Sequence, residues 1–316
     1  MRRLGMVMLA MGWALGLSQA ADAETRITYK SAKAGTSYYQ MAVELAEAVK
    51  KASEGEIIVT VEESQGSVQN VKEAAVRSGN YVFTSPPGLI RRAMAGKKPF
   101  APANPAFENL RSLFPIPSLT MHFVVRADRG IESFADLAGK TFLIGKGSFG
   151  AREAKRTLEL FGVQGVNLVE SELSNAVAAL KNGQIDGFAT AGSWPAPNVV
   201  EAAASVPVRI LSMTDEQVAE TGRTKLVIPA GTYPGMDSDV VTTSLPVGAY
   251  TVTGMEEEAA YLFTKDYWET REQRASASPW WKGVTPDGLV TLAAPLHPGA
   301  RRYYEEAGFT LPANLQ

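Results

Sequence analysis

The sequence predicts an α/β fold divided into two lobes, and three observations support this prediction. From residue 25 to residue 95, short β-branched runs alternate with stretches of helical periodicity. The same alternation resumes from residue 121 to residue 211, after a loop rich in Pro and Ala. The length of 316 residues is typical of two domains. Strands that alternate with helices form mostly parallel sheets covered by helices.

The first lobe starts with three strand–helix pairs. We expect strands at 25–30, 57–62 and 81–84, and helices at 38–51, 67–77 and 86–95. The helix at 38–51 shows the pattern most clearly, because Tyr38, Met41 and Leu45 fall on one face.

The second lobe repeats the alternation. We expect strands at 121–126, 141–144, 166–169, 186–190 and 208–211, and helices at 150–161, 174–182 and 195–204. An apolar run at 110–114 is separated from this block by Pro-Ile-Pro-Ser, and a long strand at 240–252 leads to a mostly helical end with a helix at 256–271. We therefore expect lobe 1 at 24–118 and 252–316, lobe 2 at 119–251, and hinges near 115–119 and within 240–252.

The N-terminus is typical of an export signal. Arg2 and Arg3 precede a short apolar run at 4–17, and small residues at 21–23 suit a signal peptidase that cleaves near Ala23. We expect residues 1–23 to be removed and the mature chain to be a freely diffusing periplasmic monomer.

Composition excludes several classes of function. The chain has no cysteine, which excludes disulfides, and its net charge of −2 indicates neither a nucleic-acid surface nor a basic membrane patch. His122 and His297 are the two histidines, too few for an obvious metal site, and no G-x-S-x-G motif is present. We therefore expect no enzyme activity, no metal and no cofactor.

Five turns from a strand into a helix share small or hydroxyl residues, which cap the first amides of a helix. They are Gly35-Thr36-Ser37, Gly66-Ser67, Ser85-Pro86, Gly147-Ser148-Phe149-Gly150 and Gly192-Ser193-Trp194-Pro195. In a parallel sheet such turns lie at one edge, and each helix start offers unpaired N–H groups to an anion. Three turns from the first lobe and two from the second would hold a carboxylate across a cleft.

One of these turns also satisfies the dinucleotide motif G-x-G-x-x-G at 145–150, and Glu170 follows at the expected distance. An exported protein, however, meets no nicotinamide pool in the periplasm. A kinase would need H-R-D and D-F-G, which the chain lacks. The compartment and the four similar turns favour a transported carboxylate as the anion.

The sequence resembles the TAXI-type solute receptors of tripartite ATP-independent periplasmic (TRAP) transporters. The resemblance covers essentially the whole mature chain. Its motifs are GTSYYQMAVELAEAV (35–49), SQGSVQNVKEA (64–74), DLAGKTFLIGKGSFGAREAKRTLELFGV (136–163), ALKNGQIDGFATAGSWPAPNV (179–199), IPAGTYPG (228–235) and PLHPGARRYYEEAGF (295–309).

This resemblance implies a two-lobe periplasmic binding protein of type II, or Venus flytrap, which closes on a small solute and docks on a TRAP permease in the membrane. Known members are similar to receptors for glutamate and related dicarboxylates. With Ser85 from the five turns, the expected ligand contacts are Gly35, Thr36, Tyr38, Tyr39, Gly66, Ser67, Asn70, Ser85, Ser148, Phe149, Gly192, Ser193, Trp194 and Tyr233.

The chain departs from the family pattern around its third strand. The family commonly shows an aspartate before this strand and Gln-x-Asp after it, whereas this chain reads Asn80-Tyr-Val-Phe-Thr-Ser-Pro-Pro87. Loss of an acidic partner for an α-ammonium group weakens glutamate as a ligand and favours a dicarboxylate or 2-oxo acid. The alternative is a binding protein of an ATP-driven (ABC) importer for sulfonates or amino acids, which shares the fold.

Overall fold

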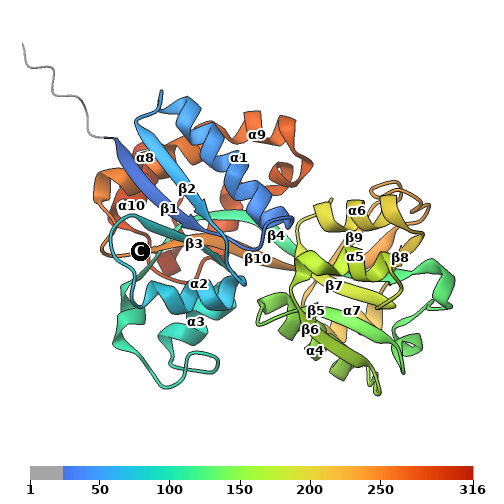
Figure 1. Cartoon of the computed structure of the whole chain (residues 1–316). Coiled ribbons are helices and arrows are strands. Elements are labelled where there is room, and N and C mark those ends of the chain that lie inside the picture. The colour runs from blue at the N-terminus through green and yellow to red at the C-terminus, as the bar shows by residue number, and fades with distance from the viewer. Residues whose placement is uncertain (1–23, 316) are drawn as a thin grey trace, which may run out of the picture.

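The computed structural model of the chain describes residues 24–315, so the expected export signal at residues 1–23 lies outside the described residues. The predicted α/β class and two-lobe arrangement are confirmed (Figure 1). The strands are β1 (Thr25–Lys30), β2 (Ile57–Glu62), β3 (Tyr81–Ser85), β4 (Leu110–Arg126), β5 (Thr141–Gly145), β6 (Asn167–Ser171), β7 (Gly187–Gly192), β8 (Val208–Ile210), β9 (Thr224–Ile228) and β10 (Val240–Val252).

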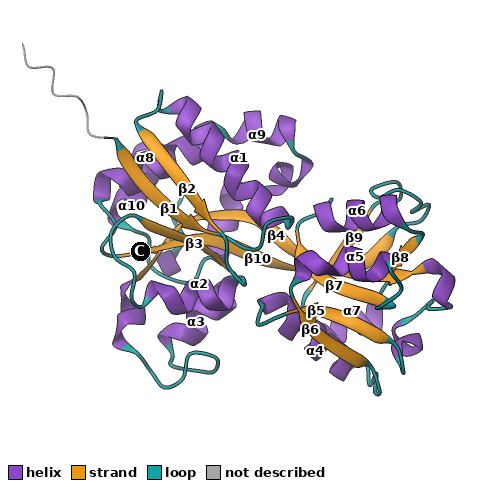
Figure 2. Cartoon of the chain, viewed as in Figure 1, coloured by secondary structure: helices purple, strands orange, loops and turns teal. Residues whose placement is uncertain are grey.

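Helices lie on both sides of the strands in each lobe (Figure 2). They are α1 (Ser37–Ala52), α2 (Ser67–Ala74), α3 (Pro87–Met94), α4 (Phe149–Leu160), α5 (Ala176–Lys181), α6 (Pro197–Ser205), α7 (Asp215–Thr221), α8 (Glu257–Glu269), α9 (Arg271–Ala277) and α10 (Pro298–Glu306). Lobe 1 contains β1–β3, α1–α3 and α8–α10, and lobe 2 contains β5–β9 and α4–α7 (Figure 1).

We expected a mostly parallel sheet, but the sheet contains both parallel and antiparallel pairs. Its strand order is β2-β1-β3-β10-β4-β7-β5-β6, with β8 beside β4 and β9 beside β10. Strands within each lobe pair in parallel, as β1 does with β2 and β3 and as β5 does with β6 and β7. The antiparallel pairs arise because β4 runs from lobe 1 into lobe 2 and β10 returns beside it.

The two crossing strands form the connection between the lobes. We expected a break at Pro-Ile-Pro-Ser, but β4 continues through it from residue 110 to residue 126. Proline cannot donate to a ladder and is tolerated where pairing is irregular, and the β4–β10 register shifts between Leu245 and Val247. The second half of β10 pairs with β3 of lobe 1, so we propose that the return crossing lies near this shift.

Several element ends also differ from the prediction. The helix expected at 256–271 is split into α8 and α9, α2 ends at Ala74, and α6 begins at Pro197. We did not predict α7 or β9. Thr214 and Gln217 form a capping box at the start of α7, which is the local reason why this helix begins there.

The core of lobe 1 is rich in aromatic residues. Phe114 of β4 stacks on Tyr267 of α8 with ring centroids 3.7 Å apart, and the Tyr267 hydroxyl donates to the Pro115 carbonyl oxygen at 2.5 Å. The C-terminal helices are thus packed directly on the crossing strand at the point where it leaves lobe 1.

Candidate functional site

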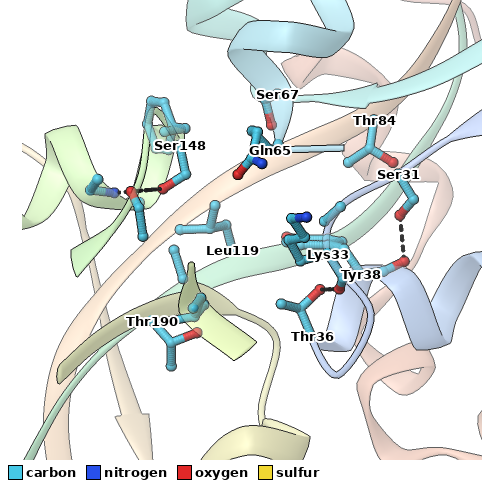
Figure 3. A pocket seen from close by; sticks show the side chains of 18 of the residues that line it. Ser31, Lys33, Thr36, Tyr38, Gln65, Ser67, Thr84, Leu119, Ser148 and Thr190 are labelled. Atoms are coloured by element: carbon cyan, nitrogen blue, oxygen red, sulfur yellow. Dashed lines mark hydrogen bonds between the residues drawn. The ribbon is translucent and has the colours of Figure 1, made fainter. Parts of the chain in front are cut away.

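A cavity lies between the lobes, where β1, β3, β5 and β7 end, and has an interior volume of about 70 Å³. Figure 3 shows Lys33, Gln65 and Ser67 on one side of it and Ser148 and Thr190 on the other. Its lining consists of Ser31, Ala32, Lys33, Thr36, Tyr38, Gln65, Gly66, Ser67, Thr84, Leu119, Gly145, Lys146, Ser148, Phe149, Gly150, Ala151, Leu173, Ala189, Thr190, Ala191 and Val247. We call it the interlobe cavity.

The starts of three helices converge on this cavity. Helices α1 and α2 begin beside it in lobe 1, and α4 begins beside it in lobe 2. The first amides of a helix have no partner within the helix and carry partial positive charge. Ser148 caps α4 by accepting from the amide of Ala151 at 2.9 Å, which leaves the preceding amides of α4 without an intrahelical partner.

The two lobes approach closely at these helix starts. Gly66 has a φ of 105°, a conformation that favours glycine, and a Cβ built on it would lie 3.7 Å from the Ser148 Cβ of the other lobe. The absence of a side chain at residue 66 therefore leaves room between α2 and α4.

Most hydroxyl groups of the lining already bond within the protein. Thr36 donates to the Lys33 carbonyl at 2.6 Å, Ser31 donates to the Tyr38 carbonyl at 2.7 Å, and Thr84 donates to the Tyr29 hydroxyl at 3.1 Å. Ser67 is different, because its hydroxyl has no hydrogen-bond partner among residues 24–315 and points into the cavity (Figure 3). This hydroxyl is available to a ligand without the loss of a protein contact.

The charged side chains in the lining are two lysines, Lys33 and Lys146, with no acidic residue. Lys33 Nζ lies 3.2 Å from Glu172 Oε2 of lobe 2. The other oxygen of this carboxylate, Oε1, accepts a hydrogen bond from Gln65 Nε2 at 3.0 Å. Burial acts to raise the pKa of Glu172, but the interactions with Lys33 and Gln65 outweigh it and hold the pKa below its usual range. A carboxylate just outside the lining thus connects lobe 2 to two polar residues of lobe 1.

Six of the expected ligand contacts line the interlobe cavity, namely Thr36, Tyr38, Gly66, Ser67, Ser148 and Phe149. The Tyr38 hydroxyl already has a protein partner, because it donates to the Pro117 carbonyl oxygen of β4 at 3.0 Å. Burial raises the pKa of Tyr38 well above its ordinary value, so the group remains a neutral phenol.

Four expected residues of lobe 1 lie outside this lining. Gly35 is exposed and Tyr39 is half-buried. Asn70 is fully buried, and its amide donates to the carbonyls of Ser31 and Thr84 at 2.8 and 3.0 Å. Asn70 therefore ties together the ends of β1 and β3. Ser85 is buried where β3 pairs with β10, which covers this turn.

The remaining expected residues, all in lobe 2, also lie outside the lining. Ser193 and Trp194 line a separate cavity with Trp280, on the other side of the crossing strands. Gly192 packs against Ser37. The Tyr233 hydroxyl accepts from the Ala196 amide at 2.9 Å and lies 2.8 Å from His122 Nε2 in the lobe 2 core. The predicted helix start at residue 195 was wrong, because α6 begins only at Pro197, so Ser193 and Trp194 lie in a loop before it.

The sequence reasoning missed several polar residues of the lining. They are Ser31, Lys33, Gln65, Thr84, Lys146 and Thr190. Their positions in the sequence could have identified them, because they lie at or just after the ends of strands, where α/β sheets bind ligands.

Two negative findings apply to residues 24–315. No group of three or more His, Asp or Glu side chains there could hold a metal ion. None of the helices in the same range is long and apolar enough to cross a membrane.

Comparison with known proteins identifies the family. The pattern of the NMT1-like family matches residues 30–308, so the chain belongs to this family.

Among solved structures, the chain is similar to the substrate-binding protein of an amino acid ABC transporter, with 14% identity, a TM-score of 0.48 and coverage of 81% of this chain and 99% of that one. It is also similar to the alkanesulfonate-binding protein SsuA from Xanthomonas axonopodis pv. citri bound to MOPS, with 15% identity, a TM-score of 0.45 and coverage of 93% and 96%. We draw no function from these distant likenesses.

Proposed function

We propose that this protein is a periplasmic solute receptor that captures a small organic anion between its lobes and delivers it to a TRAP permease. The observation that carries the proposal is the convergence of three helix starts and two lysines on an interlobe cavity whose lining has no acidic residue. Amides at helix starts bind anions through direct hydrogen bonds and the helix dipole.

The arrangement supports capture by closure of the lobes. Helices α1 and α2 come from lobe 1 and α4 comes from lobe 2, so an anion in the cavity contacts both. A ligand that contacts both lobes has a higher affinity for the closed form than for the open form, and this difference drives closure. The Ser67 hydroxyl is the proposed side-chain donor, with Thr36, Ser148 and the lysines around it.

The lining also narrows the class of anion. A carboxylate is a common partner for the ammonium group of an amino acid, but the lining contains no Asp or Glu, and Glu172 just outside it is already engaged by Lys33 and Gln65. We therefore propose a dicarboxylate or 2-oxo acid in preference to glutamate.

The positions of the two histidines favour binding over catalysis. His122 lies in the core of lobe 2 beside Tyr233, and His297 caps α10 by accepting from the Gly299 amide. Neither ring is placed to act as a general base on a molecule in the interlobe cavity.

A binding experiment tests the ligand class. Thermal unfolding and tryptophan fluorescence would be recorded with 2-oxoglutarate, succinate, glutamate and ethanesulfonate. We expect 2-oxoglutarate or succinate to raise the melting temperature, since a ligand at 100 times its Kd adds about 2.7 kcal/mol. Trp194 and Trp280 face one cavity from different lobes, so closure should change their emission. A response to glutamate or ethanesulfonate alone would contradict the proposed class.

A matched pair of variants tests the location. Ser67→Ala removes a hydroxyl without a protein partner, so we expect unchanged stability without ligand and at least a fivefold loss of affinity. Ser205→Ala removes an exposed hydroxyl that bonds only to Glu201, and should retain full affinity. Equal affinity in both variants would exclude the interlobe cavity as the binding site.

The permease is tested separately. Vesicles that contain a TRAP permease from the same organism should take up the bound solute in the presence of the receptor and an ion gradient, without ATP. Uptake that requires ATP would instead identify an ABC importer.

A further inference from the structure

A second and larger cavity between the lobes is strongly basic. It has a volume of about 570 Å³ and lies between α3 of lobe 1 and α4 of lobe 2, which face each other in Figure 1. We call it the basic cavity. Its charged lining residues are Arg91, Arg92, Lys98, Arg152, Arg156, Arg223 and Glu153. Six cationic side chains and one acidic side chain thus meet here, in a chain whose net charge is −2.

The single acid neutralises only part of this charge. Glu153 is buried and accepts from Arg223 at 2.7 and 2.9 Å, and Arg156 lies 3.3 Å from it. Among residues 24–315, no carboxylate lies within ion-pair distance of the other four cations. The positive charge of the basic cavity is therefore mostly uncompensated.

Arg152 is the most informative of these cations. It lies in the first turn of α4, where the helix dipole disfavours a positive charge. The pKa of Arg152 is lowered mainly by burial and, to a smaller extent, by the positive charge of Arg92. Helix-dipole complementarity explains Arg91 and Arg92 in the last turn of α3, but it cannot explain Arg152.

Part of the cationic wall is held in place before any ligand binds. Arg156 donates to the Thr221 carbonyl at 2.8 Å in addition to its contact with Glu153. On the other lobe, Arg92 donates to the Lys98 carbonyl at 3.2 Å. Ordered guanidinium groups are well suited to anions that accept several hydrogen bonds at once.

Phe149 is the residue that separates this cavity from the interlobe cavity, because its side chain lines both. The two cavities are therefore adjacent but have different linings. The interlobe cavity offers amides, hydroxyls and two lysines, and the basic cavity offers five arginines and one lysine.

We propose that the basic cavity binds a compact anion with two or more negative charges, of the class of pyrophosphate and citrate, and that this anion holds α3 and α4 together. Without it, cations of the two lobes repel one another as the lobes approach, and a bridging polyanion replaces this repulsion by attraction. The anion therefore acts as a second ligand that favours closure. This inference goes beyond the proposed function and does not depend on which solute is transported.

The first test measures binding of pyrophosphate to the full mature chain by calorimetry, without any carboxylate present and at constant ionic strength. We expect one site whose affinity falls about tenfold or more in Arg152→Gln and in Arg92→Gln, which lie on different lobes. Lys155→Gln removes a cation from the same helix outside the basic cavity, where it pairs with Glu170, and should bind like the wild type.

Folding of the variants is checked by thermal unfolding. Removal of an unpaired cation should leave the melting temperature unchanged or raise it at low salt. A loss of affinity that is equal in all three variants would show general charge screening and overturn the proposal, as would unchanged affinity in Arg152→Gln and Arg92→Gln.

The second test measures closure. Because the chain has no cysteine, spin labels can be attached at Val76→Cys in lobe 1 and Val200→Cys in lobe 2, whose side chains are exposed. We expect pyrophosphate to shift the distance distribution toward the shorter population, and Arg152→Gln to abolish this shift. Binding without any change in distance would overturn the bridging role. Failure of carboxylates to bind would affect the proposed function alone.

Discussion

The backbone N–H of Ser193 donates a 2.9 Å hydrogen bond to the hydroxyl oxygen of Ser37. Ser37 is the first residue of α1 in lobe 1, and Ser193 follows β7 in lobe 2. Both residues are buried. The hydrogen bond therefore joins the lobes directly.

This contact requires glycine at residue 192. A Cβ added there would overlap the Ser37 hydroxyl oxygen, whereas the next nearest atom, Ser37 Cβ, would be 3.5 Å away. We predict that Gly192→Ala lowers the free energy of unfolding by about 1–3 kcal/mol. In a chain of this size each kcal/mol corresponds to about 2–4 °C in Tm, which thermal unfolding would detect.

Two further variants test whether overlap with the Ser37 hydroxyl oxygen causes the loss of stability in Gly192→Ala. Ser37→Ala alone loses one hydrogen bond, at a cost of about 1 kcal/mol. Ser37→Ala combined with Gly192→Ala should be no less stable than Ser37→Ala alone, because the overlapping oxygen is gone. Gly283→Ala introduces a Cβ with no atom within 4 Å and serves as the control. Additive losses in the double variant would contradict this explanation.

Glu172 makes a second contact between the lobes, through Lys33 and Gln65. We predict that Glu172→Gln changes Tm by less than about 4 °C, because partly exposed ion pairs contribute at most about 1 kcal/mol. Solute affinity should fall about two- to fivefold, since this contact favours closure. High salt should reduce the difference between the variant and the wild type.

Glu170→Gln is the matched control, because Glu170 pairs with Lys155 within lobe 2. Calorimetry with the solute identified above should give wild-type affinity for this variant. If Glu170→Gln weakened binding as much as Glu172→Gln, the interlobe contact would not be the cause.

His122 should make stability depend on pH. Burial lowers the pKa of His122 to about 4, compared with 6.5 in an unfolded chain. Between these values the unfolded chain binds a proton that the folded chain does not, so the free energy of unfolding falls as the pH falls. The contribution of neutral His122 to the free energy of unfolding is fully present above pH 6.5. Between pH 7 and pH 5 this contribution falls by about 1–2 kcal/mol.

Urea unfolding of the wild type and of His122→Gln at both pH values would check this prediction. The variant should lose less stability between pH 7 and pH 5 than the wild type, even if it is less stable at both. His297, whose pKa burial also lowers, is present in both proteins and supplies part of the remaining slope. Identical losses in the two proteins would show that His122 does not titrate in this range.

Glu44 of α1 anchors the C-terminal segment to lobe 1. Its carboxylate accepts from the Ser278 hydroxyl at 2.9 Å, from Trp280 Nε1 at 3.2 Å and from Trp281 Nε1 at 2.8 Å. Glu44→Ala should lower the free energy of unfolding by about 2 kcal/mol, because it leaves the buried Trp281 N–H without a partner.

Glu47→Ala, an exposed position on the same helix, should stay within about 0.5 kcal/mol of the wild type in the same denaturant titration. A similar loss in both variants would assign the effect to helix propensity instead of the anchor.

Local patterns in the sequence were enough to predict the two α/β lobes and most strands and helices. The period of the apolar residues identifies α1 and β2, and the small and hydroxyl residues before α1, α2 and α4 mark three helix starts that line the interlobe cavity. These features depend on residues that are close together in the chain, so they do not require knowledge of the tertiary contacts.

Tertiary structure decided which of the five turns meet. The turn at Ser85 is covered because β10 returns antiparallel beside β3, and the turn at Ser193 and Trp194 lies on the other side of the crossing strands. Contacts such as Lys33 with Glu172, or Arg92 near Arg152, join residues far apart in sequence. The sequence by itself determined where α1, α2 and α4 begin and which amides these helices leave unpaired, because capping residues act locally. The path of β4 and β10 between the lobes determined which of those amides face one cavity, because only long-range strand pairing fixes that path.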